Sequence, residues 1–315
     1  MTTQADIRAD IQAAHDRIAP YIRRTPVVTL ESGALGLGFP ITLKLEHLQA
    51  TGSFKLRGAF NNLLSADLTP DTEVVAISGG NHGAAVALAA TRLGVKSTVF
   101  VPEALALEVK LARMRHFGAK VEVVPGSVKD AFEAFEARAA SPGTLQAHPY
   151  DSALTINGQG TVAREIEDQA PQIDTLMVSV GGGGLIGGVL GWYQDRIKVV
   201  AVETTGTSAL AQSLAAGARV TIQPSGISAS GLGAASIGAL PMQLIDRWLG
   251  DSVVVSDDDT RLAQQRLWDG ARLVGEPGAA TALAALTSGA YVPQKDERVG
   301  VLVCGGNAAP DWFLT

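Results

Sequence analysis

Short, almost wholly apolar runs alternate with segments of helical periodicity along most of this chain. The segment 7–18 carries isoleucine and alanine at helical spacing, whereas the run 74–77 is apolar at every position. Strands that are covered by helices on both faces have this composition, because neither face meets water. The alternation therefore predicts a doubly wound α/β fold with mostly parallel sheets flanked by helices. Strands are expected at 27–30, 41–45, 74–77, 97–101, 121–124, 176–180, 199–202 and 301–303.

The size and charge of the chain exclude several classes of protein. Its 315 residues, 46% of them hydrophobic, are enough for two closely packed lobes. The 25 basic and 31 acidic residues give a net charge of −6 and form no basic run, so a nucleic-acid partner is not expected. No apolar segment reaches the roughly 18 residues that a membrane span needs. The single cysteine, Cys304, and an N-terminus without a secretory pattern predict a cytoplasmic protein.

Four consecutive glycines, Gly181 to Gly184, separate a predicted strand from a predicted helix. Unhindered backbone N–H groups at the positive end of a helix suit a phosphate. Gly182, Gly184 and Gly187 also spell G-x-G-x-x-G, and Glu203 lies near the offset of a ribose-binding acid, which would indicate a dinucleotide. A third interpretation is close packing of a strand against a helix. The loop thus predicts an anion site without identifying the ligand.

Lys55 follows the turn-forming residues Gly52 and Ser53 and opens a predicted helix between Phe54 and Leu56. A surface lysine is the ordinary interpretation of such a residue. The N-terminus of a helix, however, is the unfavourable end for a cation. A lysine that forms an imine must present a neutral amine, and a dry site lowers the pKa of the amine. The position therefore makes Lys55 a candidate for covalent catalysis.

Three segments together resemble the signature of the pyridoxal-phosphate enzymes of the serine/threonine dehydratase and serine racemase family. They are 51–59 around Lys55, the loop 78–83 with sequence Ser-Gly-Gly-Asn-His-Gly, and the glycines 181–184. The resemblance extends over nearly the whole chain. It implies a tryptophan-synthase-beta-like fold of two lobes, with pyridoxal 5′-phosphate between them and Lys55 holding it as a Schiff base.

The resemblance also assigns roles to further residues. It implies that Phe54 packs on the cofactor ring, that Asn81 donates a hydrogen bond to the 3-hydroxyl oxygen of the ring, and that Gly181, Gly182, Gly183 and Gly184 hold the phosphate. The substrate carboxylate is expected at the loop of Ser78, Gly79, Gly80, Asn81 and His82. An ordinary strand-to-helix turn, with His82 as a capping residue, is the alternative.

Three more residues match positions that line the cofactor in the family. Cys304 occupies the place where relatives carry serine or cysteine opposite the pyridine nitrogen. A thiol cannot protonate the ring as a carboxylic acid would, which suits expulsion of a β-leaving group better than a long-lived carbanion. Glu276 and Gly231 are the other two. A small buried cysteine and a Glu-Pro helix start are the structural alternatives.

Departures from the family pattern refine these expectations. The racemases carry a second serine where this chain has Gly79, so racemisation by two bases is not expected. The divalent-cation site of the family is matched at Glu203 but not at Ala209, so no metal is expected. The chain ends at Thr315 without the regulatory extension of biosynthetic threonine dehydratases, so feedback by isoleucine is not expected. A large domain of 1–67 and 149–315, a small domain of 68–148 and a homodimer follow from the resemblance.

The resemblance therefore predicts a lyase of amino-acid metabolism. The expected reaction removes water from a β-hydroxy amino acid such as threonine or serine and yields a 2-oxo acid and ammonia, with Lys55 as the base. An amino-acid racemase on the same scaffold, a nicotinamide-dependent oxidoreductase and a catalytically silent cofactor-binding protein remain as alternatives. The sequence does not choose among threonine, serine, 3-hydroxyaspartate and an aryl-serine, nor between L and D substrates.

Overall fold

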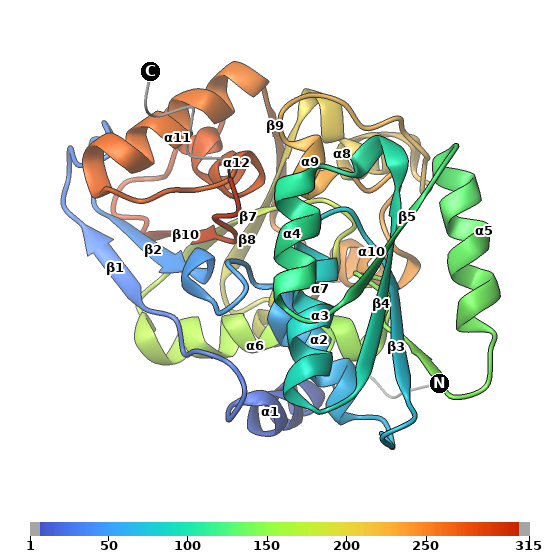
Figure 1. Cartoon of the computed structure of the whole chain (residues 1–315). Helices are drawn as coiled ribbons and strands as arrows, with labels where there is room; N and C mark the ends of the chain where they lie inside the picture. Colours follow the sequence, from blue (N-terminus) through green and yellow to red (C-terminus); the bar gives the residue numbers. More distant parts are fainter. Residues whose placement is uncertain (1–6, 309–315) are drawn as a thin grey trace.

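Two β-sheets, each with helices on both faces, make up the part of the chain that the structure describes, residues 7–308 of a computed structural model (Figure 1). The larger sheet has six strands in the order β1-β2-β10-β7-β8-β9. All its neighbouring strands run parallel except β1 and β2. Its strands are β1 Val27–Leu30, β2 Ile41–Leu45, β7 Thr175–Ser179, β8 Lys198–Thr204, β9 Asp251–Val255 and β10 Val299–Val303.

The smaller sheet contains four parallel strands in the order β5-β4-β3-β6. Its strands are β3 Glu73–Ile77, β4 Lys96–Pro102, β5 Lys120–Val124 and β6 Thr144–Gln146. Helices α3 and α4 cover one face and α5 covers the other (Figure 1). These helices are α3 Asn81–Arg92, α4 Glu108–His116 and α5 Val128–Ala139. A short 3₁₀ helix, η2 Glu103–Leu105, leads from β4 toward α4.

The remaining helices pack on the larger sheet or join the two sheets. Helix α7 lies between α6 and α10, whereas α12 packs on β7, β8 and β10 and is covered by α11 (Figure 1). The α helices of this group are α1 Ile7–Ile18, α2 Lys55–Leu64, α6 Ala153–Gln169, α7 Gly184–Tyr193, α8 Ala209–Ala216, α9 Ala229–Leu232, α10 Ala239–Trp248, α11 Asp257–Ala271 and α12 Pro277–Thr287, and the 3₁₀ helices are η1 Glu46–Leu48 and η3 Thr205–Thr207.

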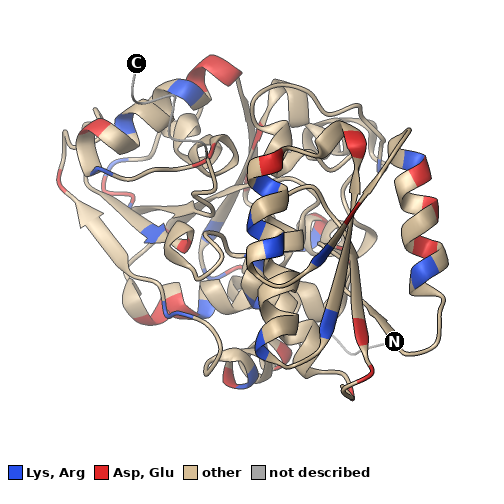
Figure 2. Ribbon diagram, viewed as in Figure 1, with Lys and Arg blue, Asp and Glu red and all other residues tan. Residues whose placement is uncertain are grey.

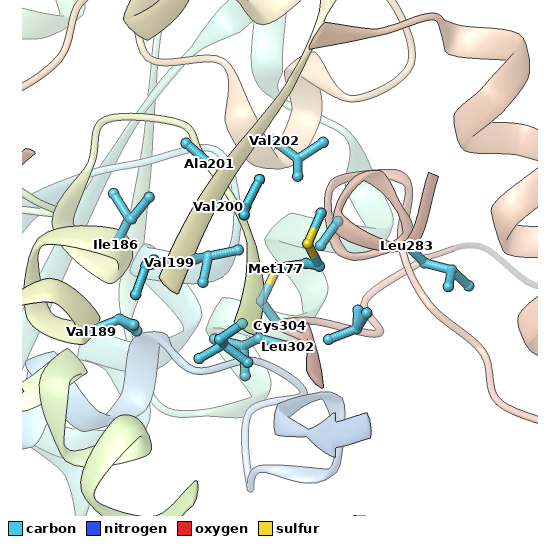
Figure 3. Close-up of a cluster of buried hydrophobic side chains, with 14 of the residues drawn as sticks. Met177, Ile186, Val189, Val199, Val200, Ala201, Val202, Leu283, Leu302 and Cys304 are labelled. Atoms are coloured by element: carbon cyan, nitrogen blue, oxygen red, sulfur yellow. The ribbon is translucent and has the colours of Figure 1, made fainter. Parts of the chain in front are cut away.

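The central strands of the larger sheet are buried on both faces, as their unbroken apolar sequence predicts. Every residue of β7 and β10 is buried. Figure 3 shows side chains of β7 and β8 packed with α7 and α12, with Cys304 directly after β10 in the same cluster. This core holds the strand ends rigidly, and the loops that follow the strands carry the candidate site.

The α/β class and the mostly parallel sheets are thus confirmed, and the eight expected strands form with bounds shifted by at most a few residues. Strands β6 and β9 were not expected. The division into domains of 1–67 with 149–315 and of 68–148 stays a prediction, and its two chain ends, 1–6 and 309–315, lie outside the described residues. Among residues 7–308, none of the helices combines the length and apolar character that crossing a bilayer requires.

Candidate active site

The candidate residues gather where strands of both sheets end. The loop 78–82 follows β3 of the smaller sheet, whereas the glycines 181–184 follow β7 and Cys304 follows β10 of the larger one. Ligands of parallel α/β sheets bind outside the carboxyl ends of the strands. Two connected cavities lie here, one of about 40 Å³ beside the glycines and one of about 380 Å³ beside the loop 78–82. Lys55 and Asn81 line both cavities.

The glycine loop leaves its backbone amides free. None of the N–H groups of Gly181 to Gly184 donates a hydrogen bond to another residue that the structure describes. Gly183 has a φ of +91°, a left-handed conformation that glycine adopts without strain. The loop opens α7, so the positive end of the helix dipole adds to the free amides. The arrangement suits a phosphate group.

Tyr150 closes one side of this loop and was not singled out from the sequence. A Cβ atom on Gly182 would overlap the ring of Tyr150, and one on Gly184 would lie 2.8 Å from the Tyr150 Cα atom. Tyr150 also lines both cavities. Glycine at these two positions is therefore required by the neighbouring tyrosine as well as by a ligand.

Lys55 is the first residue of α2, and its partly buried side chain reaches the cavities. Its Nζ atom donates a hydrogen bond of 2.8 Å to the carbonyl oxygen of Pro149 and lies 5.1 Å from the ring centroid of Phe54. Burial lowers the pKa of Lys55 to about 8, although Cys304 and Glu276 act in the opposite direction. A neutral amine is thus accessible near neutral pH, which is what a nucleophile or a base needs.

Asn81 connects helices of the two sheets. Its Nδ2 atom donates to Glu276 Oε1 at 2.6 Å, and its Oδ1 atom accepts from Asn307 Nδ2 at 2.7 Å. Glu276 is the N-cap residue of α12, and burial raises the pKa of its carboxyl group. Asn307 donates in addition to the carbonyl oxygen of Thr51, at 2.9 Å. The carboxamide of Asn81 is thereby held at the edge of the smaller cavity.

Cys304 is buried in the floor of the smaller cavity. Its Sγ atom lies 3.8 Å from the carbonyl oxygen of Gly278, toward which the thiol donates. Burial raises the pKa of this thiol, and the nearby Glu276 adds to the effect. The cysteine is therefore a neutral thiol at physiological pH. Gly231, which also lines this cavity, lies near Glu276.

The loop 78–82 presents backbone amides to the larger cavity. The N–H groups of Gly79, Asn81 and His82 donate to no other residue that the structure describes, and the loop opens the 12-residue helix α3. A carboxylate can be bound here for the same reason as a phosphate. The His82 ring, by contrast, is buried, and its Nε2 atom lies 2.8 Å from the carbonyl oxygen of Ala147. Burial and the Lys55 charge lower the pKa of His82 to about 3, so the ring stays neutral.

Leu105, which replaces the alanine that relatives usually carry before the helix at Lys110, packs on the backbone of Gly79. A Cβ atom at position 79 would lie 2.7 Å from Leu105 Cβ and 3.2 Å from its carbonyl oxygen. The two residues belong to segments that follow β3 and β4. No side chain therefore fits at position 79 unless the η2 segment moves.

A buried ion network anchors the helix that carries Lys55. The Arg57 guanidinium pairs with both oxygens of Glu46, at 2.7 and 2.8 Å, and with both oxygens of Glu165, each at 2.8 Å. Lys44 adds a bond of 2.6 Å to Glu165. Two cations and two anions thus compensate each other in the interior, which is the condition for burying charges at all. Arg57 lies two residues after Lys55 and fixes the first turn of α2.

Glu203 lies away from these cavities. Its buried carboxylate accepts hydrogen bonds of 2.8 Å from the backbone N–H groups of Leu210 and Ala211, at the start of α8. Burial raises the pKa of Glu203 to about 7, against the effect of these two bonds. Within residues 7–308 no group of three or more histidine, cysteine or acidic residues is placed to hold a metal ion. The carboxylate caps a helix, so its geometry gives no support to a ribose contact.

The structure brings together the residues that the sequence singled out. The smaller cavity is lined by Phe54, Lys55, Asn81, Gly181, Gly182, Gly183, Gly184, Gly231, Glu276 and Cys304, and the larger one by Ser78, Gly79, Gly80, Asn81 and His82 among others. Tyr150 and Asn307 are the residues to which sequence reasoning gave no role, although both stand in short motifs that match the family. Leu105 differs from the alanine usual in relatives, but only the structure shows its contact with Gly79.

Comparison with known proteins agrees with this geometry. The family model of "Pyridoxal-phosphate dependent enzyme" matches residues 18–305. A serine racemase of Arabidopsis thaliana is 35% identical over 96% of this chain and 93% of its own length. A phenylserine dehydratase of Ralstonia pickettii is 35% identical over 97% of this chain and 94% of its own. The crystal structure of a threonine deaminase from T.th. superposes with a TM-score of 0.88 at 34% identity, covering 96% of this chain and 98% of the other.

Proposed function

The chain belongs to the family of pyridoxal-phosphate dependent enzymes, and we propose that within this family it is a dehydratase that removes water from a β-hydroxy amino acid such as threonine or serine. Loss of water leaves an enamine that becomes an imine, and hydrolysis of the imine by water gives a 2-oxo acid and ammonia. The cofactor of the family is pyridoxal 5′-phosphate, which leaves no role for the nicotinamide alternative. Serine racemases and dehydratases are about equally similar to this chain, so the choice between them rests on its own residues.

The residues of the smaller cavity fit this cofactor. The free amides of Gly181 to Gly184 would hold its phosphate, Asn81 would face the ring hydroxyl, Cys304 would face the ring nitrogen, and Lys55 would hold the aldehyde carbon with Phe54 beside it. Two observations support this assignment. The glycine amides donate to no other described residue, and the buried thiol of Cys304 is neutral, as a partner for an unprotonated nitrogen must be.

The reaction needs a base at the α-carbon and an acceptor for the electrons released there. Pyridoxal phosphate supplies the acceptor when it is bound. Lys55 would take the α-proton once the substrate amine has displaced it from the cofactor, because its free amine lies in the cavity and its lowered pKa makes the neutral form accessible. The ammonium that forms at Lys55 is then an acid within the same cavity and can return the proton to the departing hydroxyl, which leaves as water.

The substrate carboxylate would bind at the loop 78–82. Its free amides stand at the positive end of α3, and the Ser78 hydroxyl adds a further donor. The Ser78 oxygen already accepts from the Gly80 N–H at 3.1 Å, so its own hydrogen is available to a ligand. His82 would contribute its backbone amide rather than its ring.

The contact of Leu105 with Gly79 is the observation that carries the choice of dehydratase. Racemisation requires a second acid or base opposite Lys55, and the racemases of the family carry a serine at the position of Gly79. Leu105 occupies the space of any side chain there, with its Cβ atom 2.7 Å from where a Cβ atom would lie. The chain thus favours loss of the β-group over return of a proton to the opposite face.

An assay of both products tests the proposal. Purified holoenzyme is incubated with L- and D-threonine and L- and D-serine, and ammonia, 2-oxo acid and enantiomeric composition are measured together. We expect 2-oxo acid and ammonia in equal amounts, no inverted amino acid, and no turnover by Lys55→Ala. Inverted amino acid without 2-oxo acid would identify a racemase instead, and turnover by the alanine variant would refute the role of Lys55.

We also propose a cytoplasmic homodimer. The location rests on the single cysteine and on the N-terminal sequence, and the dimer rests on the family resemblance. Light scattering coupled to gel filtration tests the dimer, and a mass of one chain would contradict it.

A further inference from the structure

We propose that the substrate carries a large apolar group on its β-carbon, an aryl or branched alkyl group, which is bound by Leu105 and Leu107. The inference rests on the proposed elimination reaction and names its substrate class. It starts from the cavity of about 380 Å³ beside Lys55, which adjoins the residues assigned to the cofactor and whose wall beyond them is largely apolar.

The composition of the cavity wall favours an apolar group. Beyond the loop 78–82 and Lys55, the lining side chains are mostly aliphatic or aromatic, and none of the described lining residues is acidic. Leu105 and Leu107 project from the η2–α4 segment on one side, and Leu232 and Ala234 lie on another. The apolar wall therefore adjoins the loop that would hold the carboxylate.

The side chains of the two leucines are exposed to solvent, and a bound ligand would cover them. Leu105 is 49% exposed and Leu107 56%, and both line the larger cavity. Exposed apolar side chains gathered at a cavity mark a binding site more often than isolated ones do. Because Leu105 is packed on Gly79, its side chain is fixed relative to the carboxylate loop. A β-substituent that extends from a bound amino acid would contact both leucines.

An acidic β-substituent is the main competitor, because α4 carries several basic residues (Figure 2). Of these, Lys110 reaches the larger cavity. Lys110 and Arg113 also line a neighbouring cavity of about 20 Å³ together with Glu276. Both cations lie near Glu276 and act against the burial that raises the pKa of its carboxyl group. The part of the wall formed by Leu105, Leu107, Leu232 and Ala234 carries no charge.

The specificity of the enzyme tests the inference. We compare kcat/KM of holoenzyme for 3-phenylserine, threonine and 3-hydroxyaspartate, each as both diastereomers. Phenylserine places several more apolar carbons in the pocket than threonine does. The enzyme should therefore favour phenylserine by at least about tenfold, since one methylene already changes specificity by about 10- to 200-fold. Leu105→Asn keeps the branching and the non-hydrogen atom count of the side chain but makes it smaller and polar, and should lower the phenylserine-to-threonine ratio at least about tenfold.

Val109→Asn is the matched control. Val109 lies on the same segment and is 61% exposed, but it lines a different cavity. This variant should keep the substrate ratio of the original enzyme. An equal loss of the ratio in both variants would overturn the assignment of Leu105, as would a preference of the original enzyme for threonine or for 3-hydroxyaspartate.

Binding separates this inference from the proposed reaction. Phenylalanine and alanine lack a β-hydroxyl group, so neither can lose water, and their binding is followed by the absorbance of the bound cofactor. Phenylalanine should bind at least about tenfold more tightly than alanine, and Leu105→Asn should remove the difference. If no amino acid yields a 2-oxo acid but phenylalanine still binds more tightly than alanine, the proposed elimination is refuted and the apolar subsite is supported. Equal binding of the two would overturn the subsite even in an active dehydratase.

Discussion

The amine of Lys55 should titrate far below an ordinary lysine. Burial lowers its pKa from 10.5 to about 8. At pH 7 the neutral amine would then be about 9% of the population, against about 0.03% for an unperturbed lysine, a ratio of about 300. Neutral amine is the form that attacks a carbonyl group or removes a proton, so this ratio translates directly into reactivity.

Competitive acylation of the cofactor-free protein measures this titration. The protein is labelled with a trace of acetic anhydride between pH 6 and 11, and the modified peptides are quantified by mass spectrometry. Lys129 serves as the exposed internal reference, because its side chain is 83% accessible. We expect half-maximal labelling of Lys55 near pH 8. The cofactor-free protein should also recombine with pyridoxal phosphate with a rate that rises through the same pH range.

The result that would refute this reasoning is a Lys55 midpoint near 10.5. It would mean that water solvates the amine in spite of its position, and that burial does not prepare it for imine formation. Lys55→Ala controls the assignment, because the labelled peptide should disappear in that variant.

Three further outcomes follow from the geometry of the site and its support. Gly182→Ala should weaken cofactor binding by about 1–3 kcal/mol in a spectral titration, because the added methyl group overlaps the Tyr150 ring; unchanged affinity would contradict the close fit. Arg57→Met removes the cation that pairs with the buried Glu46 carboxylate and leaves Glu165 with Lys44 alone. It should lower the free energy of unfolding in urea by about 3–5 kcal/mol, whereas a loss below 1 kcal/mol would contradict the network. Glu203 has a folded pKa raised to about 7, so its contribution to stability is present below pH 4.5 and lost as the pH rises through 7. Glu203→Gln should flatten that part of the pH profile of unfolding, and an identical slope in both proteins would refute the shift.

The sequence predicted eight strands from short, mostly apolar runs, and it predicted the loops that follow several of them. The runs at the centre of the larger sheet, β7 and β10, are buried at every residue, so their identity depends little on distant contacts. The strands that it missed are weaker locally: β6 has three residues, and β9 begins with Asp251 and Ser252. Their pairing with β3 and β8 makes them strands, which is a tertiary effect.

The residues of the candidate site that lie in compact motifs were predicted, and the contacts between distant segments were not. Lys55, Asn81 and the glycine loop are recognisable because each lies in a compact motif. The contact of Leu105 with Gly79 joins two separate loops, and the close approach of Tyr150 to Gly182 joins segments still farther apart in the chain. Only the arrangement of strands brings such pairs together. The pKa shifts of Lys55 and Glu203 arise from burial, which the local sequence does not reveal.

The two sheets carry different parts of the proposed site. This separation explains how one scaffold can serve several reactions. Lys55 and the glycine loop are anchored on the larger sheet, the former through the Arg57 network, whereas the carboxylate loop and Leu105 come from the smaller sheet. Asn81 joins the halves by its hydrogen bonds to Glu276 and Asn307. A substitution in the η2 segment would therefore change which β-group is accepted, and whether position 79 can carry a side chain, without moving the base or the phosphate site.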